Sequence, residues 1–141
     1  MKILIIGAAG MVGRKLTAAL VAAGQVGGKP ISSLALADVI APDKPDFAGE
    51  VTTTAVDLST PGVAEQLVAG RPDLIFHLAA IVSGEAEADF DKGYRINLDG
   101  TRYLLEAIRQ EGARNGPYKP RLVFTSSIGV FGAPFPEAIS D

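Results

Sequence analysis

Near its start the chain reads Ile3-Leu4-Ile5-Ile6-Gly7-Ala8-Ala9-Gly10-Met11-Val12-Gly13. A short, unbroken apolar run such as residues 3–6 is typical of a strand that is buried on both faces of a parallel sheet. Residues 14–24 follow with apolar side chains at helical spacing and end on a glycine, which predicts a helix. We expect the helix to face the core with Val12, Leu16, Ala19 and Ala23. The three glycines therefore lie at a turn from a strand into a helix.

Glycine has three physical uses at such a turn. It permits a tight turn, lets the helix pack closely on the strand, and lets the pyrophosphate of a dinucleotide approach the backbone. The helix that follows offers unpaired N–H groups and a partial positive charge to the phosphates. The alternative is an ordinary tight turn, because turns collect glycine. We predict a dinucleotide site formed by Gly7, Ala9, Gly10, Met11, Val12 and Gly13.

The composition limits the classes of protein. The chain has 141 residues, of which 48% are hydrophobic and 21% charged, as expected for one globular domain. A net charge of −3 with scattered basic residues provides no surface for a nucleic acid. The absence of cysteine excludes disulfides and thiolate metal sites, and no metal site is expected. No apolar stretch is long enough to span a bilayer, and the first residues are not a signal peptide, so a cytoplasmic location without membrane contact is expected.

Strands and helices alternate along the rest of the chain. The predicted strands are residues 31–38, 51–58, 73–80 and 121–124, and the predicted helices are residues 61–69 and 88–111. Residues 25–30, 41–50 and 81–88 are predicted loops. The longer helix has apolar positions at helical spacing, with glycine stops at Gly112 and Gly116: Phe90, Tyr94, Leu98, Thr101, Leu105 and Ile108. The alternation predicts an α/β fold with a doubly wound parallel sheet and helices on both faces.

Asp38 ends the second predicted strand, 25 positions after Gly13. A carboxylate at that point of a dinucleotide-binding fold accepts hydrogen bonds from both hydroxyls of the adenosine ribose. It would also repel the 2′-phosphate of NADP, and residues 39–42 contain no arginine to bind one. Asp38 therefore favours NAD over NADP as the cofactor. The alternative is an ordinary surface carboxylate at a strand end.

Three further polar residues lie near the ends of predicted strands. Asp57 either faces the adenine edge of a dinucleotide or caps the next turn, and the sequence favours neither role. His77 is the only histidine; it is either a proton shuttle or, as we favour, a core imidazole bonded to the backbone. Ser83 lies in the predicted loop of residues 81–88, where open α/β sheets bind ligands, and is suited to a small polar substrate.

These motifs, in this order, resemble the extended short-chain dehydrogenase/reductase family and, within it, the NAD-dependent epimerase/dehydratase group. The motifs are Gly7-x-x-Gly10-x-x-Gly13, Asp38, Asp57-Leu58, His77-Leu78-Ala79-Ala80, Tyr94-x-x-Asn97-x-x-Gly100-Thr101 and Phe124-Thr125-Ser126-Ser127 leading to Val130-Phe131-Gly132. The resemblance covers the whole chain. It implies a Rossmann-type NAD-binding domain over residues 1–141.

The resemblance also implies roles for individual residues. Ser127 aligns with the catalytic serine, whose hydroxyl binds the reacting oxygen of the substrate, and Asn97 aligns with the helix asparagine that supports a proton-relay water. Ala79 and Ala80 are expected to line the nicotinamide ribose with their backbone. The other expected cofactor contacts are Asp57, Leu58, Asn97 and Ser126. The expected substrate contacts are Ser83 and Ser127.

Residues 80–90 and 127–134 are similar to sugar-acid dehydrogenases of this family, which oxidise the C2 hydroxyl of a four-carbon sugar acid. The similarity implies a sugar acid as the substrate. Family members commonly form homodimers through the long helix. A homodimer is therefore expected, and the isolated chain is expected to self-associate through residues 88–111.

One family feature is missing from the sequence. The general base of the family and the lysine that lowers its pKa form a Tyr-x-x-x-Lys motif after the serine, and no tyrosine here has lysine four positions later. We therefore expect the chain to be the N-terminal part of a longer enzyme and to be inactive on its own. Two other functions remain open: a nucleotide-sugar epimerase or dehydratase, and a non-catalytic NAD-binding module if the natural chain has this length.

Overall fold

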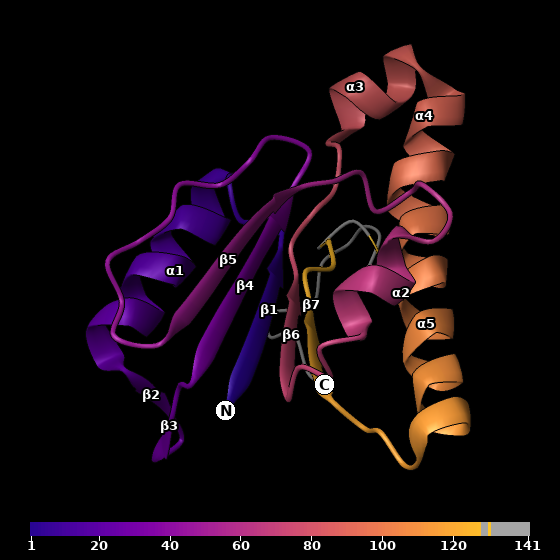
Figure 1. The fold of residues 1–141 in the computed structure, drawn as a ribbon. Helices are drawn as coiled ribbons and strands as arrows, with labels where there is room; N and C mark the ends of the chain where they lie inside the picture. The colour runs from indigo at the N-terminus through magenta and orange to yellow at the C-terminus, as the bar shows by residue number, and fades with distance from the viewer. Residues whose placement is uncertain (128–129, 131–141) are drawn as a thin grey trace.

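The computed structural model, which describes residues 1–127 and residue 130, has a five-stranded parallel sheet at its centre (Figure 1). The strands are β1 Lys2–Ile6, β4 Ser33–Asp38, β5 Glu50–Ala55, β6 Leu74–His77 and β7 Arg121–Phe124. They lie side by side in the order β5-β4-β1-β6-β7, and every neighbouring pair is parallel. The predicted strands are confirmed. The strands β5 and β6 end at Ala55 and His77, three residues before the predicted ends at residues 58 and 80.

Helices cover both faces of the sheet (Figure 1). The helix α1 Met11–Ala23 lies on one face, and α2 Val63–Val68 and α5 Gly100–Asn115 lie together on the other. This is the doubly wound, Rossmann-type arrangement that the sequence predicts. Within the described residues, no helix combines the length and the apolar character needed to cross a membrane.

The strand β1 is the centre of the core. Its residues 3–6 are at most 2% exposed, which confirms a strand buried on both faces. Successive side chains of a strand point to opposite faces. Accordingly, Ile5 packs in the layer that contains Leu20 of α1, and Leu4 packs in the layer that contains Leu104 of α5.

The face with which α1 meets the sheet differs from the predicted one. Its buried residues are Gly13, Thr17 and Leu20. Of the predicted residues, Leu16 is half-buried, and the exposed ones are Val12, Ala19 and Ala23. The cause is Gly13, which has only hydrogen where a side chain would stand and so lets α1 touch the backbone of Gly7. The closest contact between α1 and the turn after β1 is made by a glycine, and a pattern of apolar side chains does not reveal such a contact.

Residues 25–30, predicted as a loop, form a small antiparallel hairpin of β2 Gln25–Val26 and β3 Lys29–Pro30. Gly27 and Gly28 connect the two strands with φ values of +56° and +78°. A two-residue hairpin turn of this kind needs positive φ at both positions, which glycine adopts without strain. The Gly-Gly pair therefore specifies a turn rather than an irregular loop.

The predicted loop of residues 81–88 contains a helix, α3 Ser83–Ala88. The predicted helix of residues 88–111 is also corrected: the chain runs through α4 Phe90–Tyr94 and the π-helical turn η1 Arg95–Asp99 into α5. Asp89 separates α3 from α4, because its carboxylate accepts a hydrogen bond from the N–H of Lys92 at 3.0 Å and thus caps α4.

The helix α5 ends later than predicted, and a different side of it faces the core. Gly112 lies inside the helix, and Gly116, with a φ of +86°, follows its last residue. The buried residues of α5 are Gly100, Leu104 and Ala107. Most of the apolar residues that define the predicted stripe are exposed instead: Phe90, Tyr94, Leu98 and Leu105.

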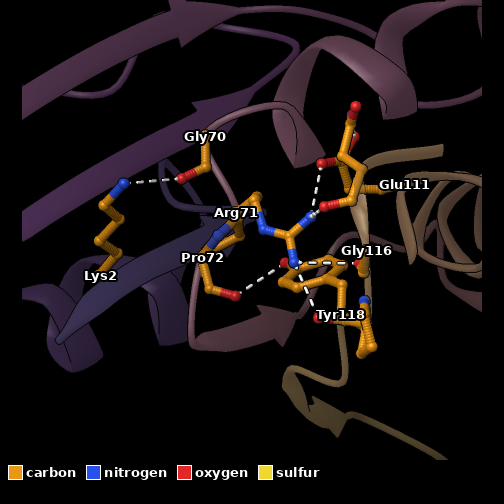
Figure 2. A network of polar contacts seen from close by, with 9 residues as sticks. Lys2, Gly70, Arg71, Pro72, Glu111, Gly116 and Tyr118 are labelled. Atoms are coloured by element: carbon orange, nitrogen blue, oxygen red, sulfur yellow. Dashed lines mark hydrogen bonds and ion pairs between the residues drawn. The ribbon is translucent and has the colours of Figure 1, made fainter. Parts of the chain in front are cut away.

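Arg71 fastens the end of α5 to the turn before β6 (Figure 2). Its guanidinium pairs with the carboxylate of Glu111 at 2.9 Å and donates to the carbonyl oxygen of Pro117 at 2.9 Å. It also lies 4.8 Å from the ring centroid of Tyr118, whose hydroxyl donates to the carbonyl oxygen of Pro72 at 2.7 Å. The network lies at the amino end of β6, which is the end opposite the loops described next.

Candidate functional site

The direction in which strands are added to the sheet reverses at β1. The chain adds β4 and β5 on one side of β1 and then β6 and β7 on the other. Open parallel sheets bind ligands at the carboxyl ends of the strands beside such a reversal. There the turn after β1 lies against the segment after β6: a Cβ built on Gly7 would stand 2.7 Å from the backbone nitrogen of Ala79. Gly7 also has a φ of +91°, so two independent constraints require glycine here.

The glycine turn leaves the start of α1 open to a ligand. Of the atoms that the structure describes, a Cβ built on exposed Gly10 would meet only the carbonyl oxygen of Gly7, at 3.4 Å, and Met11 and Val12 beside it are exposed. Among the described residues, no side chain caps the first turn of α1, and that turn holds no acidic residue. Its N–H groups are therefore suited to bind an anion. The residues present fit the pyrophosphate of a dinucleotide.

Asp38 holds the glycine turn against the end of β4. One carboxylate oxygen accepts a hydrogen bond from the N–H of Ala9 at 2.9 Å, and the other accepts one from the N–H of Val39 at 2.7 Å. The N–H of Gly7 also donates to the carbonyl oxygen of Ala37 at 2.9 Å. Each oxygen of the Asp38 carboxylate still has an acceptor site. The side chain is thus suited to ribose hydroxyls and would repel a phosphate.

Asp57 lies in the loop after β5 and is held by two neighbours. Ser59 donates to Oδ1 from its N–H at 2.9 Å and from its hydroxyl at 2.6 Å, and Arg95 donates to Oδ2 at 3.0 Å. Partial burial by itself would raise the pKa of Asp57, but the hydrogen bonds from Ser59 and Arg95 together lower that pKa below its ordinary value. The turn-capping role is confirmed, and the adenine contact stays a prediction.

Leu58 follows Asp57, but its side chain points into the protein. It is 7% exposed and belongs to the core layer that contains Leu104 of α5. A Cβ built on Gly100 would meet the Leu58 side chain at 3.6 Å. The side chain thus fastens the loop to α5, and only the backbone of Leu58 is left for the predicted cofactor contact.

The side chain of Asn97 forms hydrogen bonds with the backbone of the segment that follows β6. Its amide oxygen accepts a hydrogen bond from the N–H of Ile81, and its amide nitrogen donates to the carbonyl oxygen of Ile81, both at 3.0 Å. This two-point contact fixes the position of the segment that contains Ala79 and Ala80. Asn97 lies in η1, and π-helical turns are rare and frequent at functional sites. The proton-relay role of Asn97 stays a prediction.

His77 is a core residue, as favoured from the sequence. It is 1% exposed, and its Nε2 lies 2.9 Å from the hydroxyl oxygen of Thr101, which donates to the carbonyl oxygen of Asn97 at 3.1 Å. When the hydroxyl proton of Thr101 is donated to Asn97, Nε2 of His77 is the donor to Thr101, and Nδ1 of the neutral ring carries no proton. Burial lowers the pKa of His77, in agreement with a neutral ring. Its partner is a side chain rather than the predicted backbone.

A hollow of about 620 Å³ lies at the carboxyl ends of β6 and β7. The predicted site residues that line it come from three segments: Ala79, Ala80, Asn97, Ser126 and Ser127. The structure thus brings the expected nicotinamide-ribose contacts together with both expected catalytic residues. Ser83 begins α3 directly after Val82, which lines the hollow, and its substrate contact stays a prediction. Phe131 and Gly132 of the serine motif lie outside the described residues.

Sequence reasoning does not identify Ile81 or Arg95 as parts of the site. Ile81 takes part through its backbone, which leaves no mark in a side-chain pattern. Arg95 lies two positions before Asn97 in the helix motif, and nothing in the sequence connects it with Asp57, which is 38 positions away.

Known proteins share this arrangement. The sequence model of the NAD dependent epimerase/dehydratase family matches residues 3–141. D-erythronate dehydrogenase from Cupriavidus necator is 43% identical to the chain over 145 aligned residues, which cover 100% of this chain and 43% of that protein. The resemblance inferred from the motifs is confirmed.

Two solved structures are similar as well. The nucleoside-diphosphate-sugar epimerase from Agrobacterium tumefaciens has 67% sequence identity and a TM-score of 0.91, covering 96% of this chain and 40% of that one. The uronate dehydrogenase from Agrobacterium tumefaciens, solved as a mutant complexed with NAD, has 31% identity and a TM-score of 0.67, covering 89% of this chain and 40% of that one. The chain thus spans about 40% of the length of these relatives. Because the family model matches nearly all of its residues, the chain belongs to the NAD-dependent epimerase/dehydratase family, whose cofactor is the one that the sequence predicts.

Proposed function

We propose that the protein is an NAD-dependent dehydrogenase that oxidises the C2 hydroxyl of a sugar acid such as D-erythronate to the 2-oxo acid. The observation that carries this proposal is the 43% identity to D-erythronate dehydrogenase along the entire chain. The geometry supports it, because the turn suited to a pyrophosphate and the hollow that contains Ser127 lie at the carboxyl ends of the strands beside the reversal.

In this proposal the residues of the chain bind and orient the reactants, and NAD, when bound, accepts the hydride. The first turn of α1 binds the pyrophosphate, and Asp38 binds the adenosine ribose. Ser127 binds the oxygen on C2 through its hydroxyl, and Asn97 fixes the lining of the hollow by holding Ile81. Removal of the hydroxyl proton needs a general base, which contributes roughly 10²–10⁴-fold to the rate. The family resemblance assigns that step to a tyrosine and a lysine after the serine.

A second candidate is a nucleotide-sugar epimerase. It is favoured by the 67% identity to the structure described as a nucleoside-diphosphate-sugar epimerase. The two functions share the cofactor turn and the hollow, and they differ in whether NADH accumulates. A dehydrogenase releases one NADH for each substrate oxidised, whereas an epimerase returns the hydride and leaves no net NADH.

The test uses the full-length protein with NAD and either D-erythronate or UDP-glucose. We expect NADH to accumulate with D-erythronate and UDP-glucose to remain unchanged. The Ser127→Ala variant is expected to lower kcat at least roughly tenfold with little change in NAD affinity, because the hydroxyl is proposed to contact the reacting group. Ser32→Ala, at the amino end of β4, is the matched control and should leave kcat unchanged. Conversion of UDP-glucose to its epimer, without oxidation of any sugar acid tested, would establish the second candidate instead.

We also propose that the full-length protein is a homodimer whose interface contains the exposed apolar residues of α4, η1 and α5. These side chains are between 50% and 67% exposed: Phe90, Tyr94, Leu98 and Leu105. Large apolar side chains exposed along one helical run are typical of an interaction site. Leu98→Glu should shift the protein from dimer to monomer in analytical ultracentrifugation while its far-UV circular dichroism stays unchanged. A wild-type protein that remains monomeric at high concentration would contradict the proposal.

A further inference from the structure

Arg95 reaches from the first position of η1 to the loop after β5 and contacts two residues there. Its Nη1 donates to Oδ2 of Asp57 at 3.0 Å and to the hydroxyl oxygen of Ser59 at 2.7 Å. The hydroxyl of Ser59 in turn donates to Oδ1 of Asp57 at 2.6 Å. The three side chains therefore form a closed ring of hydrogen bonds, in which the single hydroxyl proton of Ser59 is fully accounted for.

The ring leaves one acceptor site of the carboxylate open. A carboxylate has about four lone-pair sites. The N–H and the hydroxyl of Ser59 use the two on Oδ1, and Arg95 uses one of the two on Oδ2. Within the described part of the chain, Arg95 is the only cation that pairs with Asp57. The carboxylate is thus held at both oxygens and still able to accept one hydrogen bond from a ligand.

We propose that Arg95 is a positioning residue for the base of the cofactor: it fixes Asp57 so that the open acceptor site receives a hydrogen bond from the 6-amino group of adenine. This inference rests on the proposed use of NAD, because the amino group belongs to the adenine of that cofactor. Without Arg95, Oδ2 of Asp57 would be free to turn toward water. The carboxylate would then accept a hydrogen bond from water as readily as from the amino group of adenine, and the preference for adenine would decrease.

The backbone around Arg95 explains why this residue can fix a loop. Arg95 lies in the same π-helical turn as Asn97, which forms two hydrogen bonds with the backbone of Ile81. The turn continues directly into α5. Because the Asn97–Ile81 contact also holds this turn, the backbone of Arg95 moves less than the backbone of a loop residue would, and its side chain has fewer accessible positions. The partner Ser59 is 5% exposed and belongs to the buried base of the loop. Arg95 thus joins the adenine side of the site to the segment that lines the hollow.

The test compares two dinucleotides on the full-length protein. NAD carries the 6-amino group, whereas deamino-NAD carries an oxygen there, which accepts hydrogen bonds and cannot donate one to a carboxylate. We expect wild-type protein to bind NAD more tightly, as measured by calorimetry. In Arg95→Ala the ratio of the two affinities should fall by roughly tenfold or more, as expected for a lost hydrogen bond to a charged group. Arg95→Lys should retain part of the ratio because it keeps the positive charge.

Arg102→Ala is the matched control. Arg102 lies on the same helical run, pairs with Asp99 at 3.5 Å and is not in contact with Asp57. Its removal should leave the ratio at the wild-type value. Arg95→Ala should also keep the wild-type melting temperature, because the Arg95 and Asp57 side chains are 49% and 34% exposed and such ion pairs add little stability.

Two results would overturn the inference: an unchanged ratio in Arg95→Ala, or an equal weakening of both dinucleotides, which is what a merely structural role produces. If Arg95→Ala does not fold, the ratios of Arg95→Lys and Arg95→Gln decide in the same way. A wild-type protein that binds neither dinucleotide would instead reject the proposed function itself, so the two failures are distinguishable.

Discussion

Replacement of Gly13 by alanine tests how the turn from β1 into α1 is built. A Cβ at this position would lie 2.1 Å from the carbonyl oxygen of Gly7, and 2.7 Å and 2.8 Å from the Cα and carbonyl oxygen of Ala8. All three are backbone atoms, and the N–H groups of both residues are bonded to the carbonyl oxygen of Ala37. The turn therefore cannot yield, and α1 must move away from the sheet by roughly 1 Å in a close-packed interior.

The expected cost follows from two opposing effects. Overpacking costs about 1–3 kcal/mol, and contact with fixed backbone atoms puts Gly13→Ala at the upper end. The higher helix propensity of alanine returns about 1 kcal/mol. We expect a net loss of about 2 kcal/mol of unfolding free energy, which lowers the melting temperature by roughly 4–8 °C in a domain of ordinary size. NAD affinity should fall as well, because the displaced helix carries the N–H groups proposed to bind the pyrophosphate.

Gly10→Ala is the matched control for this experiment. Gly10 has a φ of −68°, and in the described part of the chain a Cβ there would meet only the carbonyl oxygen of Gly7, at 3.4 Å. The variant should therefore keep its melting temperature to within roughly 3 °C. It should still lose NAD affinity, because the added methyl group would stand at the exposed turn. Thermal denaturation and calorimetric titration measure the two quantities. A wild-type melting temperature for Gly13→Ala, or an equal loss in both variants, would refute the packing argument.

Three further outcomes are expected. Asp38→Asn keeps an oxygen for the N–H of Ala9 but removes the negative charge, so the preference for NAD over NADP should fall roughly tenfold or more in calorimetric titrations; an unchanged preference would contradict the role of Asp38. Arg71 has a φ of +49°, so Arg71→Gly, which relieves that strain, should be more stable than Arg71→Ala by about 1 kcal/mol in urea unfolding, with NAD affinity unchanged in both. Burial lowers the pKa of His77, so the unfolded chain binds a proton more readily, and stability is lost as the pH falls below the ordinary value of 6.5. The melting temperature of the wild type should thus decrease more steeply below that pH than that of His77→Gln, and equal slopes would contradict the assignment.

Much of the site could be predicted because its signals are local in the sequence. The turn after β1 needs only the apolar run of residues 3–6 and the spacing of the glycines. Asp38 follows from the direction of the chain, since the ends of parallel strands meet at one edge of the sheet. Ser127 and Asn97 are predicted from motifs of a few residues each. The segment around Ser83 shows the limit, because the sequence predicts a loop for residues 81–88 and the structure has the helix α3 there.

The sequence by itself determined the alternation of the five sheet strands with helices, the parallel sheet, the family and the expected cofactor, because each depends on periodicity and on short motifs. Only the tertiary structure decided which side of α1 meets the sheet, where the long helix begins, and what the polar side chains hold. Arg95 and Asp57 are 38 positions apart in the chain, and Asn97 and Ile81 are 16 apart. Such contacts depend on how closely the backbones approach after folding. At Gly13 that approach is set by the absence of a side chain, which no pattern of apolar residues records.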